Sequence, residues 1–395
     1  MFDIIPLRGG LDNVEGFFSG GVSVGLKQGG KKDVAFIRTQ EPSPVTAIFT
    51  SNKFQAAPIK HFKRYGETFL TNFILINSKN ANAMTGEEGI NDITELLSQL
   101  PKSLNAVNPI MSSTGVIGYR LNRAKIAQAF ELFEFEAKDS NGAAEAIMTT
   151  DRFKKEICLR VDLKNGGSFH IAAIAKGAGM ICPALATMLC FIATDAKVPQ
   201  DSADRLLKEA ADESFNAISV DGDTSTNDTV MLISSGKSGV WNEEAFREAL
   251  KLLTRELALL IVKDGEGSKK VVAFEVKNAA SLEDAKSAAK ALSNSLLVKT
   301  AIFGEDPNWG RIASTIGASG IACDEEKLSI KYDDVLVYSS AAKEMSKDTE
   351  SAANQVMRQE SYKICCDLGL GNYGFTAYGC DLGHEYVSIN ADYRS

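Results

Sequence analysis

The chain has 395 residues, of which 44% are hydrophobic and 24% charged, and its formal net charge at neutral pH is −8. This is the composition of an ordinary globular protein, long enough for two domains or for one large one. Because charges of both signs are interspersed and no basic stripe is present, we expect no nucleic-acid partner.

The N-terminus and the cysteines favour a protein of the reducing cytoplasm. No basic region followed by an apolar run opens the chain, so we expect no signal peptide. The most apolar window, residues 181–193, is too short to span a bilayer, so we expect no membrane association. The seven cysteines are odd in number and scattered, and they form neither a redox pair nor a zinc knuckle.

Runs rich in β-branched and aromatic residues alternate with helical patterns along the chain. Helices are predicted over residues 122–133 and 201–215, and two more begin at the N-caps Asn242 and Ser281. Since composition marks no domain boundary, the predicted class is mixed α/β, with large sheets covered by helices. Strands are predicted over residues 33–38, 45–50, 72–76, 169–175, 230–234, 271–276, 373–378 and 385–389.

The most unusual segment is Lys176-Gly-Ala-Gly-Met-Ile-Cys-Pro-Ala-Leu-Ala-Thr187-Met-Leu, which follows one predicted strand. Its glycines allow a sharp turn, and Pro183 suits the first turn of a helix. A threonine at a turn into a helix would be well placed for chemistry. A buried threonine bonded to its own helix backbone explains the same pattern, and the segment alone favours that structural interpretation.

Other polar turns could contribute to a site. Thr114 and Gly115 lie in a small polar turn after an apolar run, and such a turn can aim a hydroxyl and a backbone N–H at a developing oxyanion. Residues 219–229 are dense in acidic and hydroxyl groups but lack the spacing of a calcium-binding EF-hand. Residues 304–311 form a further polar stretch.

Two patterns are better explained by structure than by function. The glycines of residues 369–374 match a dinucleotide-binding pattern, but a strand is predicted to follow, so a hairpin turn explains them better. His61, His170 and His384 are far apart in the sequence, and Cys380 with His384 does not make a metal site. We therefore expect no metal and no Ser-His-Asp triad.

Taken together, these segments resemble the glutamate N-acetyltransferase / ornithine acetyltransferase family of arginine biosynthesis. The resemblance implies a self-processing acetyltransferase similar to N-terminal-nucleophile enzymes in its logic. Two positions depart from the family pattern: Ala184 stands where the family usually has Asn, and Lys79 where it usually has Gly. The resemblance runs over nearly the whole chain and includes residues 20–27, 76–83, 113–118, 147–151, 176–189, 220–228, 306–311 and 390–393.

The family resemblance implies cleavage between Ala186 and Thr187, giving an α chain of residues 1–186 and a β chain of residues 187–395. Thr187 would be the nucleophile, with its freed α-amine as the base that a weak hydroxyl needs. It would take an acetyl group from N2-acetylornithine and pass it to L-glutamate. Thr114 and Gly115 would form the oxyanion hole.

The resemblance further implies the binding partners. Acetyl-CoA could also donate the acetyl group, no other cofactor is expected, and two α and two β chains would form a heterotetramer. Two alternatives remain: an amidase or aminopeptidase of the N-terminal-nucleophile type, and an uncut, non-catalytic metabolite-binding protein. The substrate contacts implied by the resemblance are Thr150, Lys176, Thr187, Glu266, Asn390 and Ser395.

Overall fold

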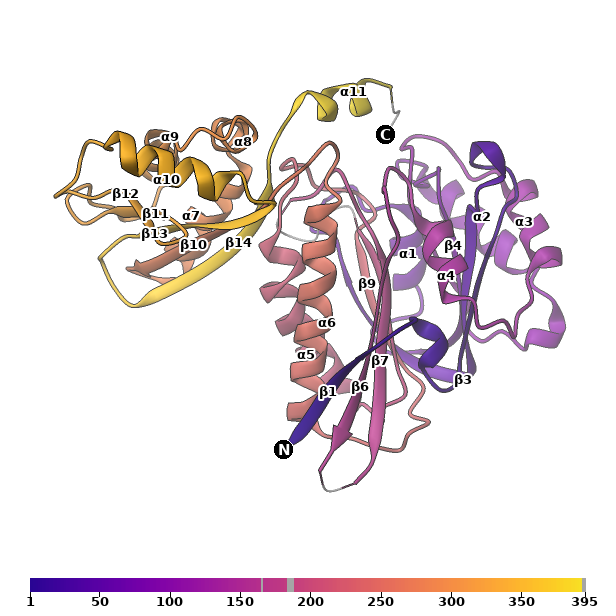
Figure 1. Cartoon of the computed structure of the whole chain (residues 1–395). Coiled ribbons are helices and arrows are strands. Elements are labelled where there is room, and N and C mark those ends of the chain that lie inside the picture. The colour runs from indigo at the N-terminus through magenta and orange to yellow at the C-terminus, as the bar shows by residue number, and fades with distance from the viewer. Residues whose placement is uncertain (165, 183–187, 393–395) are drawn as a thin grey trace.

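The computed structural model describes residues 1–164, 166–182 and 188–392, which form a larger and a smaller lobe (Figure 1). Each lobe is built on its own β-sheet, and helices pack on both sheets. The predicted class, mixed α/β with sheets covered by helices, is confirmed. No helix in these described ranges is long and apolar enough to cross a membrane.

The larger sheet has nine strands in the order β1–β6–β7–β8–β9–β3–β4–β5, with β2 beside β3. β3 alone covers both strands predicted over residues 33–50, and its first half pairs with β2 while its second half pairs with β9. The strands are β1 (Phe2–Leu7), β2 (Phe17–Val22), β3 (Val34–Phe49), β4 (Leu70–Asn77), β5 (Ile110–Ser113), β6 (Lys155–Leu163), β7 (Ser168–Lys176), β8 (Leu189–Thr194) and β9 (Thr229–Ser234).

The two halves of this sheet face each other, because β3 runs from one half into the other. The core between them includes Ile37 and Ile74 from one half and Ile174 and Phe191 from the other. Helix α4 contributes to the same core. On the opposite face of β3 and β4, a separate core is covered by α2 (Gly86–Leu97) and α3 (Arg123–Leu132). The bounds of the other two helices are Ala57–Lys63 for α1 and Ser140–Ile147 for α4.

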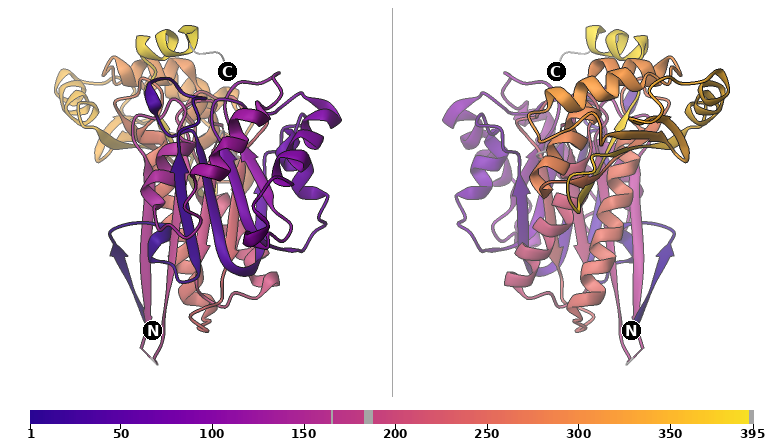
Figure 2. Two further views of the ribbon diagram at one scale, coloured as in Figure 1. Left: turned by 90° about the vertical axis from the view of Figure 1, so that its right-hand side faces the viewer. Right: turned by 90° about the vertical axis from the view of Figure 1, so that its left-hand side faces the viewer.

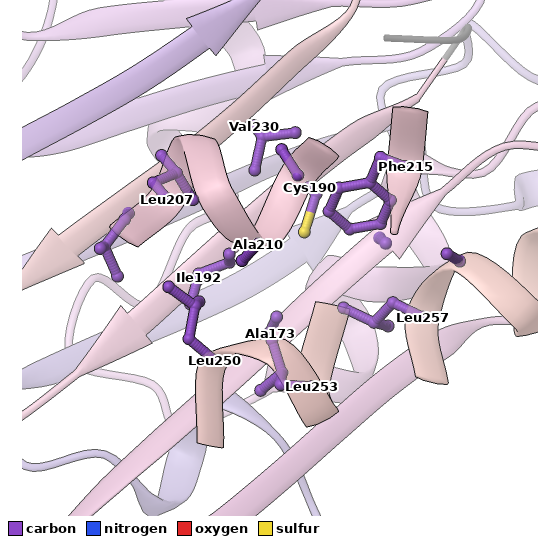
Figure 3. Packing of buried hydrophobic residues seen from close by; sticks show 14 of the residues in the cluster. Ala173, Cys190, Ile192, Leu207, Ala210, Phe215, Val230, Leu250, Leu253 and Leu257 are labelled. Atoms are coloured by element: carbon purple, nitrogen blue, oxygen red, sulfur yellow. The ribbon is translucent and has the colours of Figure 1, made fainter. Parts of the chain in front are cut away.

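Helices α5 (Gln200–Glu213) and α6 (Glu243–Lys263) cover the opposite face of β7 and β8. Leu250, Leu253 and Leu257 recur at helical spacing on α6 and point at the sheet, as Figure 3 shows. Burial of each such leucine stabilises the fold by about 1.5–3 kcal/mol. Asn242 accepts a hydrogen bond from the Ala245 N–H at 2.9 Å, so the predicted N-cap is confirmed.

The smaller lobe has five strands in the order β12–β11–β13–β10–β14. Its predicted N-cap is also confirmed, since Ser281 accepts a hydrogen bond from the Asp284 N–H at 3.0 Å. The elements are β10 (Val271–Ala279), α7 (Leu282–Asn294), α8 (Leu296–Phe303), α9 (Trp309–Ala318), β11 (Ser329–Tyr332), β12 (Val335–Tyr338), α10 (Lys347–Met357), β13 (Ser361–Asp367) and β14 (Tyr373–Cys380).

The glycine-rich stretch of residues 369–374 is not the hairpin turn that its sequence suggests. It joins β13 to β14, which lie on either side of β10 rather than beside each other. Gly369 has φ of 62°, and a Cβ on Gly371 would lie 2.4 Å from the Ala279 carbonyl oxygen. The glycines therefore allow the chain to pass close to the end of β10 on its way from β13 to β14. The strand that follows leaves no place for a dinucleotide-binding helix.

Two further predictions are wrong. Residues 385–389 belong to helix α11 (His384–Asp392), in which the half-buried Tyr386 and Ile389 lie three residues apart on one side. The segment after Thr187 continues as strand β8 instead of a helix. Its six residues are all buried between β7 and β9, and such a short apolar run cannot be told from a buried helix by periodicity.

The predicted chain boundary lies within the larger lobe and not between the lobes. Residues 183–187 lie outside the described ranges, and they connect β7 to the adjacent antiparallel strand β8. Ala173 and Ile192, from the two sides of the boundary, share one core (Figure 3). The division at 186/187 thus remains a prediction about cleavage.

Candidate active site

The ends of β7 and β5 meet the loop before β9 at a pocket of about 710 Å³, including its open mouth. All six described candidate residues line it, although they come from widely separated parts of the chain. Ala186, Thr187 and Ser395 lie outside the described residues. The candidates in the pocket are Thr114, Gly115, Thr150, Lys176, Glu266 and Asn390.

The turn of Thr114 and Gly115 is held close to a second turn. The Thr114 N–H donates to the Asn77 carbonyl at 3.0 Å, and Thr114 is one of the residues that line the pocket. Gly115 has φ of 134°, and a Cβ there would lie 2.2 Å from the Lys79 carbonyl carbon. Only glycine fits this close approach.

Lys79 illustrates why the family pattern has glycine at that position. Its φ is 72°, in the left-handed region that disfavours side chains with a Cβ. The lysine therefore carries a backbone cost of about 1 kcal/mol that glycine would avoid. Lys79 packs its backbone against the Gly115 turn, so this departure changes a neighbour of the turn. It does not replace a residue that lines the pocket.

Lys176 places a buried cation in the pocket. It is the last residue of β7 and only 2% exposed. Burial lowers its pKa, and the nearby Asp151 carboxylate opposes that shift. A buried ammonium is a good partner for a carboxylate ligand, because the ligand would supply the charge that the lost water no longer balances.

Acidic groups line the same pocket. Glu266 donates its backbone N–H to the Ala178 carbonyl at 2.9 Å, which joins its loop to the one after β7. Its side chain accepts from the Asn390 amide at 2.6 Å. Asp221 accepts from the Met180 N–H at 2.6 Å, and burial raises its pKa. A pocket with one cation and several carboxyl groups suits a zwitterionic amino acid.

The loop before β9 fixes the chain on the far side of the predicted cleavage point. Asn227 donates to the carbonyls of Ala81 (2.6 Å) and Ser113 (2.8 Å). Asp228 accepts from the N–H of Met188, the residue after Thr187, at 3.1 Å. Burial raises the pKa of Asp228 well above its ordinary range. The loop therefore anchors the start of β8 beside the pocket.

Sequence reasoning missed part of this pocket. Residues 219–229 are dense in acidic and hydroxyl groups, but their sequence alone indicates no role in a site. Tyr386 was missed because its segment was predicted to be a strand. Its hydroxyl donates to Asp221 at 3.2 Å, and it lines the pocket with Asn390 from the same helix.

None of the three histidines is among the residues that line the pocket. His61 is buried, and burial lowers its pKa to about 4. His170 places its Nδ1 3.0 Å from an Asp195 carboxylate oxygen, outside the pocket. Within the described ranges, no group of three His, Cys, Asp or Glu residues could hold a metal ion. The side chains that line this pocket thus offer no histidine base to a nucleophile.

Comparison with known proteins gives matches along the whole chain. The ArgJ family model matches residues 19–395. The arginine biosynthesis bifunctional protein ArgJ of Wolinella succinogenes is 59% identical over 396 residues, which cover all of both chains. The glutamate N-acetyltransferase of Methanothermobacter thermautotrophicus is 41% identical and covers 98% of each. The crystal structure of argJ from Bacillus halodurans is 37% identical, with a TM-score of 0.49, over 51% of this chain and 98% of that one.

Proposed function

The chain belongs to the ArgJ family of arginine-biosynthesis acyltransferases, and we propose that it transfers an acetyl group from N2-acetylornithine to L-glutamate. The products would be ornithine and N-acetylglutamate. One observation carries the proposal: the six described candidate residues converge on one pocket that combines a buried lysine with carboxyl groups. Both substrates carry a free α-carboxylate, so one lysine would serve both half-reactions.

The proposed nucleophile is the side-chain hydroxyl of Thr187, which becomes the first residue of its chain when the Ala186–Thr187 bond is cleaved. The new α-amine of Thr187 would act as its base, since a free α-amine titrates at about pH 7.7–8.0. The support from the described residues is that β7 and β8 bracket this bond and that Asp228 holds Met188 beside the pocket. Because β7 and β8 share one core, the chains 1–186 and 187–395 would stay associated after cleavage.

The acetyl transfer takes two balanced steps. The Thr187 oxygen attacks the acetyl carbon of N2-acetylornithine, the carbon–nitrogen bond breaks, and the departing amine takes the proton. The amine of glutamate then attacks the resulting ester, the carbon–oxygen bond breaks, and the hydroxyl regains a proton. In both steps the Thr114 hydroxyl and the Gly115 N–H would stabilise the negative charge on the acetyl oxygen.

The substrate contacts follow from the charges in the pocket. Lys176 would bind the α-carboxylate, and Glu266, held by Asn390, would bind or orient the ornithine ammonium. Thr150 would add a hydroxyl from the loop before β6. Ser395 would complete the site from the C-terminus. Acetyl-CoA would be a second donor to the same Thr187, and two αβ units would form the heterotetramer.

The cleavage test is mass spectrometry of the purified protein. We expect two chains, residues 1–186 and 187–395, without any added protease. Thr187→Ala should give one uncut and inactive chain, whereas Thr187→Ser should still be cut. Thr300→Ala, the same change at an exposed position of α8, is the control and should be cut normally. A wild-type chain that is intact and fully active would contradict the mechanism.

The acetyl-transfer assay separates the rival activities. With N2-acetylornithine and glutamate, we expect parallel lines in double-reciprocal plots, because both half-reactions share one acetyl-enzyme. Replacing the donor by acetyl-CoA tests the second donor directly. Acetyl release to water at the same rate with and without glutamate would instead indicate an amidase.

A further inference from the structure

A chain of fully buried charges lies beside the pocket, and the mechanism above does not use it. The Lys155 ammonium lies 2.8 Å from an Asp151 carboxylate oxygen and 2.6 Å from one of Asp264. All three side chains have 0% exposure. Buried charges destabilise a fold unless they are paired and hydrogen-bonded. Each charged group of this ionic triad therefore needs an oppositely charged partner and hydrogen bonds to its remaining atoms.

Asp151 holds two pocket segments at once. One carboxylate oxygen accepts from the Gly177 N–H at 2.8 Å, directly after Lys176. The other accepts from the Thr149 N–H at 2.9 Å, directly before Thr150. A single side chain therefore sets the places of two proposed substrate contacts that are 26 residues apart.

Asp264 extends the same chain of contacts to the other end of the pocket. It follows the last residue of α6 and precedes Glu266 by two residues. Its carboxylate accepts from the Arg152 N–H and Nε, each at 3.1 Å, in addition to Lys155. Arg152 also donates to the Lys263 carbonyl through one of its terminal nitrogens. The loop of Glu266 is thus joined to the loop of Asp151.

Lys155 supplies the positive charge that pairs with the two buried carboxylates of Asp151 and Asp264. Burial alone would raise the pKa of Asp151, but Lys155, Lys176 and the Thr149 N–H together lower that pKa well below its ordinary range. The ionised Asp151 in turn favours the charged form of Lys176. Without Lys155, two buried carboxylates would share one region with less compensating charge.

We propose that Lys155 is a positioning residue for acetyl transfer, which holds Asp151 and Asp264 together so that Lys176 is correctly placed to bind the substrate α-carboxylate. This inference rests on the proposed function. The triad also spans the predicted cleavage, since Asp151 and Lys155 precede residue 187 and Asp264 follows it. The pocket would then keep its shape after the chain is cut.

The test compares Lys155→Met with the wild type on two acetyl donors. One donor is N2-acetylornithine, and the other is N-acetylputrescine, which is the same molecule without the α-carboxylate. Misplacement of Lys176 should lower kcat/KM for N2-acetylornithine by about 100-fold. The value for N-acetylputrescine should fall far less, so the preference for the carboxylate should collapse. A role confined to stability would lower both values together.

Lys154→Met is the matched control, because Lys154 is the adjacent lysine with an exposed side chain. It should keep the wild-type preference. If Lys155→Met does not fold, Asp264→Asn keeps the shape of the triad while removing one charge, and it should weaken the preference in the same direction. A folded variant with the wild-type preference, or with equal losses on both donors, would overturn the proposal. Failure of the proposed function would show separately, as a wild-type protein that transfers no acetyl group from either donor.

Discussion

The pocket has two sides that are held in place by different kinds of interaction. On the sheet side, Thr114 and Lys176 are buried and lie at the ends of paired strands. On the other side, α11 has no buried residue, and it lies above both lobes in the two views of Figure 2. It reaches the pocket through hydrogen bonds of Tyr386 to Asp221 and of Asn390 to Glu266.

This difference indicates how each side responds to change. The sheet side is stabilised by the burial of a large core, so its side chains are held in fixed positions before substrate arrives. The α11 side depends on single hydrogen bonds, each worth about 0.5–1.5 kcal/mol. We therefore expect changes on the sheet side to have large effects, on the chemical step at Thr114 and on carboxylate binding at Lys176, and changes in α11 to have smaller effects on binding.

The largest effect should come from the sheet side, at Thr114. Thr114→Ala should lower kcat by about 10²–10³, the loss typical of one oxyanion-hole donor. KM should change little, because this hydrogen bond would mature only in the transition state. Thr114→Ser keeps the hydroxyl and is the control. An increase in KM with kcat unchanged would assign Thr114 to ground-state binding.

The neighbouring glycine tests how rigid that side is. Gly115→Ala should lower the free energy of unfolding by about 1–3 kcal/mol, because alanine would be strained at φ of 134° and would collide with the Lys79 backbone. Gly86→Ala is the control: its φ is 62°, but nothing lies within 4 Å of a Cβ there. Denaturant unfolding measures both. Equal losses in the two variants would mean that the close approach to Lys79 contributes nothing.

Lys176 should give the sheet side a pH dependence. Burial lowers the pKa of Lys176, so its ammonium is lost at a lower pH than the ordinary 10.5. The charged form exists below that pKa, and KM for N2-acetylornithine should therefore rise as the pH increases through it, by about tenfold per pH unit beyond it. N-acetylputrescine carries the same amine without the carboxylate and should lack this rise. A rise of equal size with both donors would exclude Lys176 as its source.

The smallest effect should come from α11. Tyr386→Phe removes the hydrogen bond to Asp221 and should raise KM by about 2- to 10-fold, with kcat nearly unchanged. Tyr373→Phe, at an exposed position of β14, should have no effect. A hundredfold loss of kcat in Tyr386→Phe would mean that α11 affects the chemical step as strongly as the sheet side does. That result would contradict the distinction between the two sides of the pocket.

Much of this architecture follows from local sequence patterns. The leucines of α6 recur at helical spacing, and Asn242 and Ser281 are caps whose hydrogen bonds need only residues three positions away. The mixed α/β class follows from the alternation of such patterns. The six described candidates could be named because the chain resembles a known family over nearly its whole length, although periodicity alone would not have assigned them a role.

Other features depend on partners that a local pattern does not contain. Residues 189–194 form a strand because β7 and β9 flank them, and residues 385–389 are helical although they were predicted as a strand. Strands β13 and β14 are separated by β10, which is distant in sequence.

The ionic triad of Asp151, Lys155 and Asp264 is the clearest feature that a local sequence pattern does not predict, because Lys155 and Asp264 are 109 residues apart. In the sequence, each of its three members is a charged residue that would be expected at the surface. The sequence by itself determined the fold class, the helix caps and, through the family resemblance, the six described candidates in the pocket. Only the tertiary structure decided which of those segments meet and which charges between them are buried, since burial and charge pairing depend on contacts between distant parts of the chain.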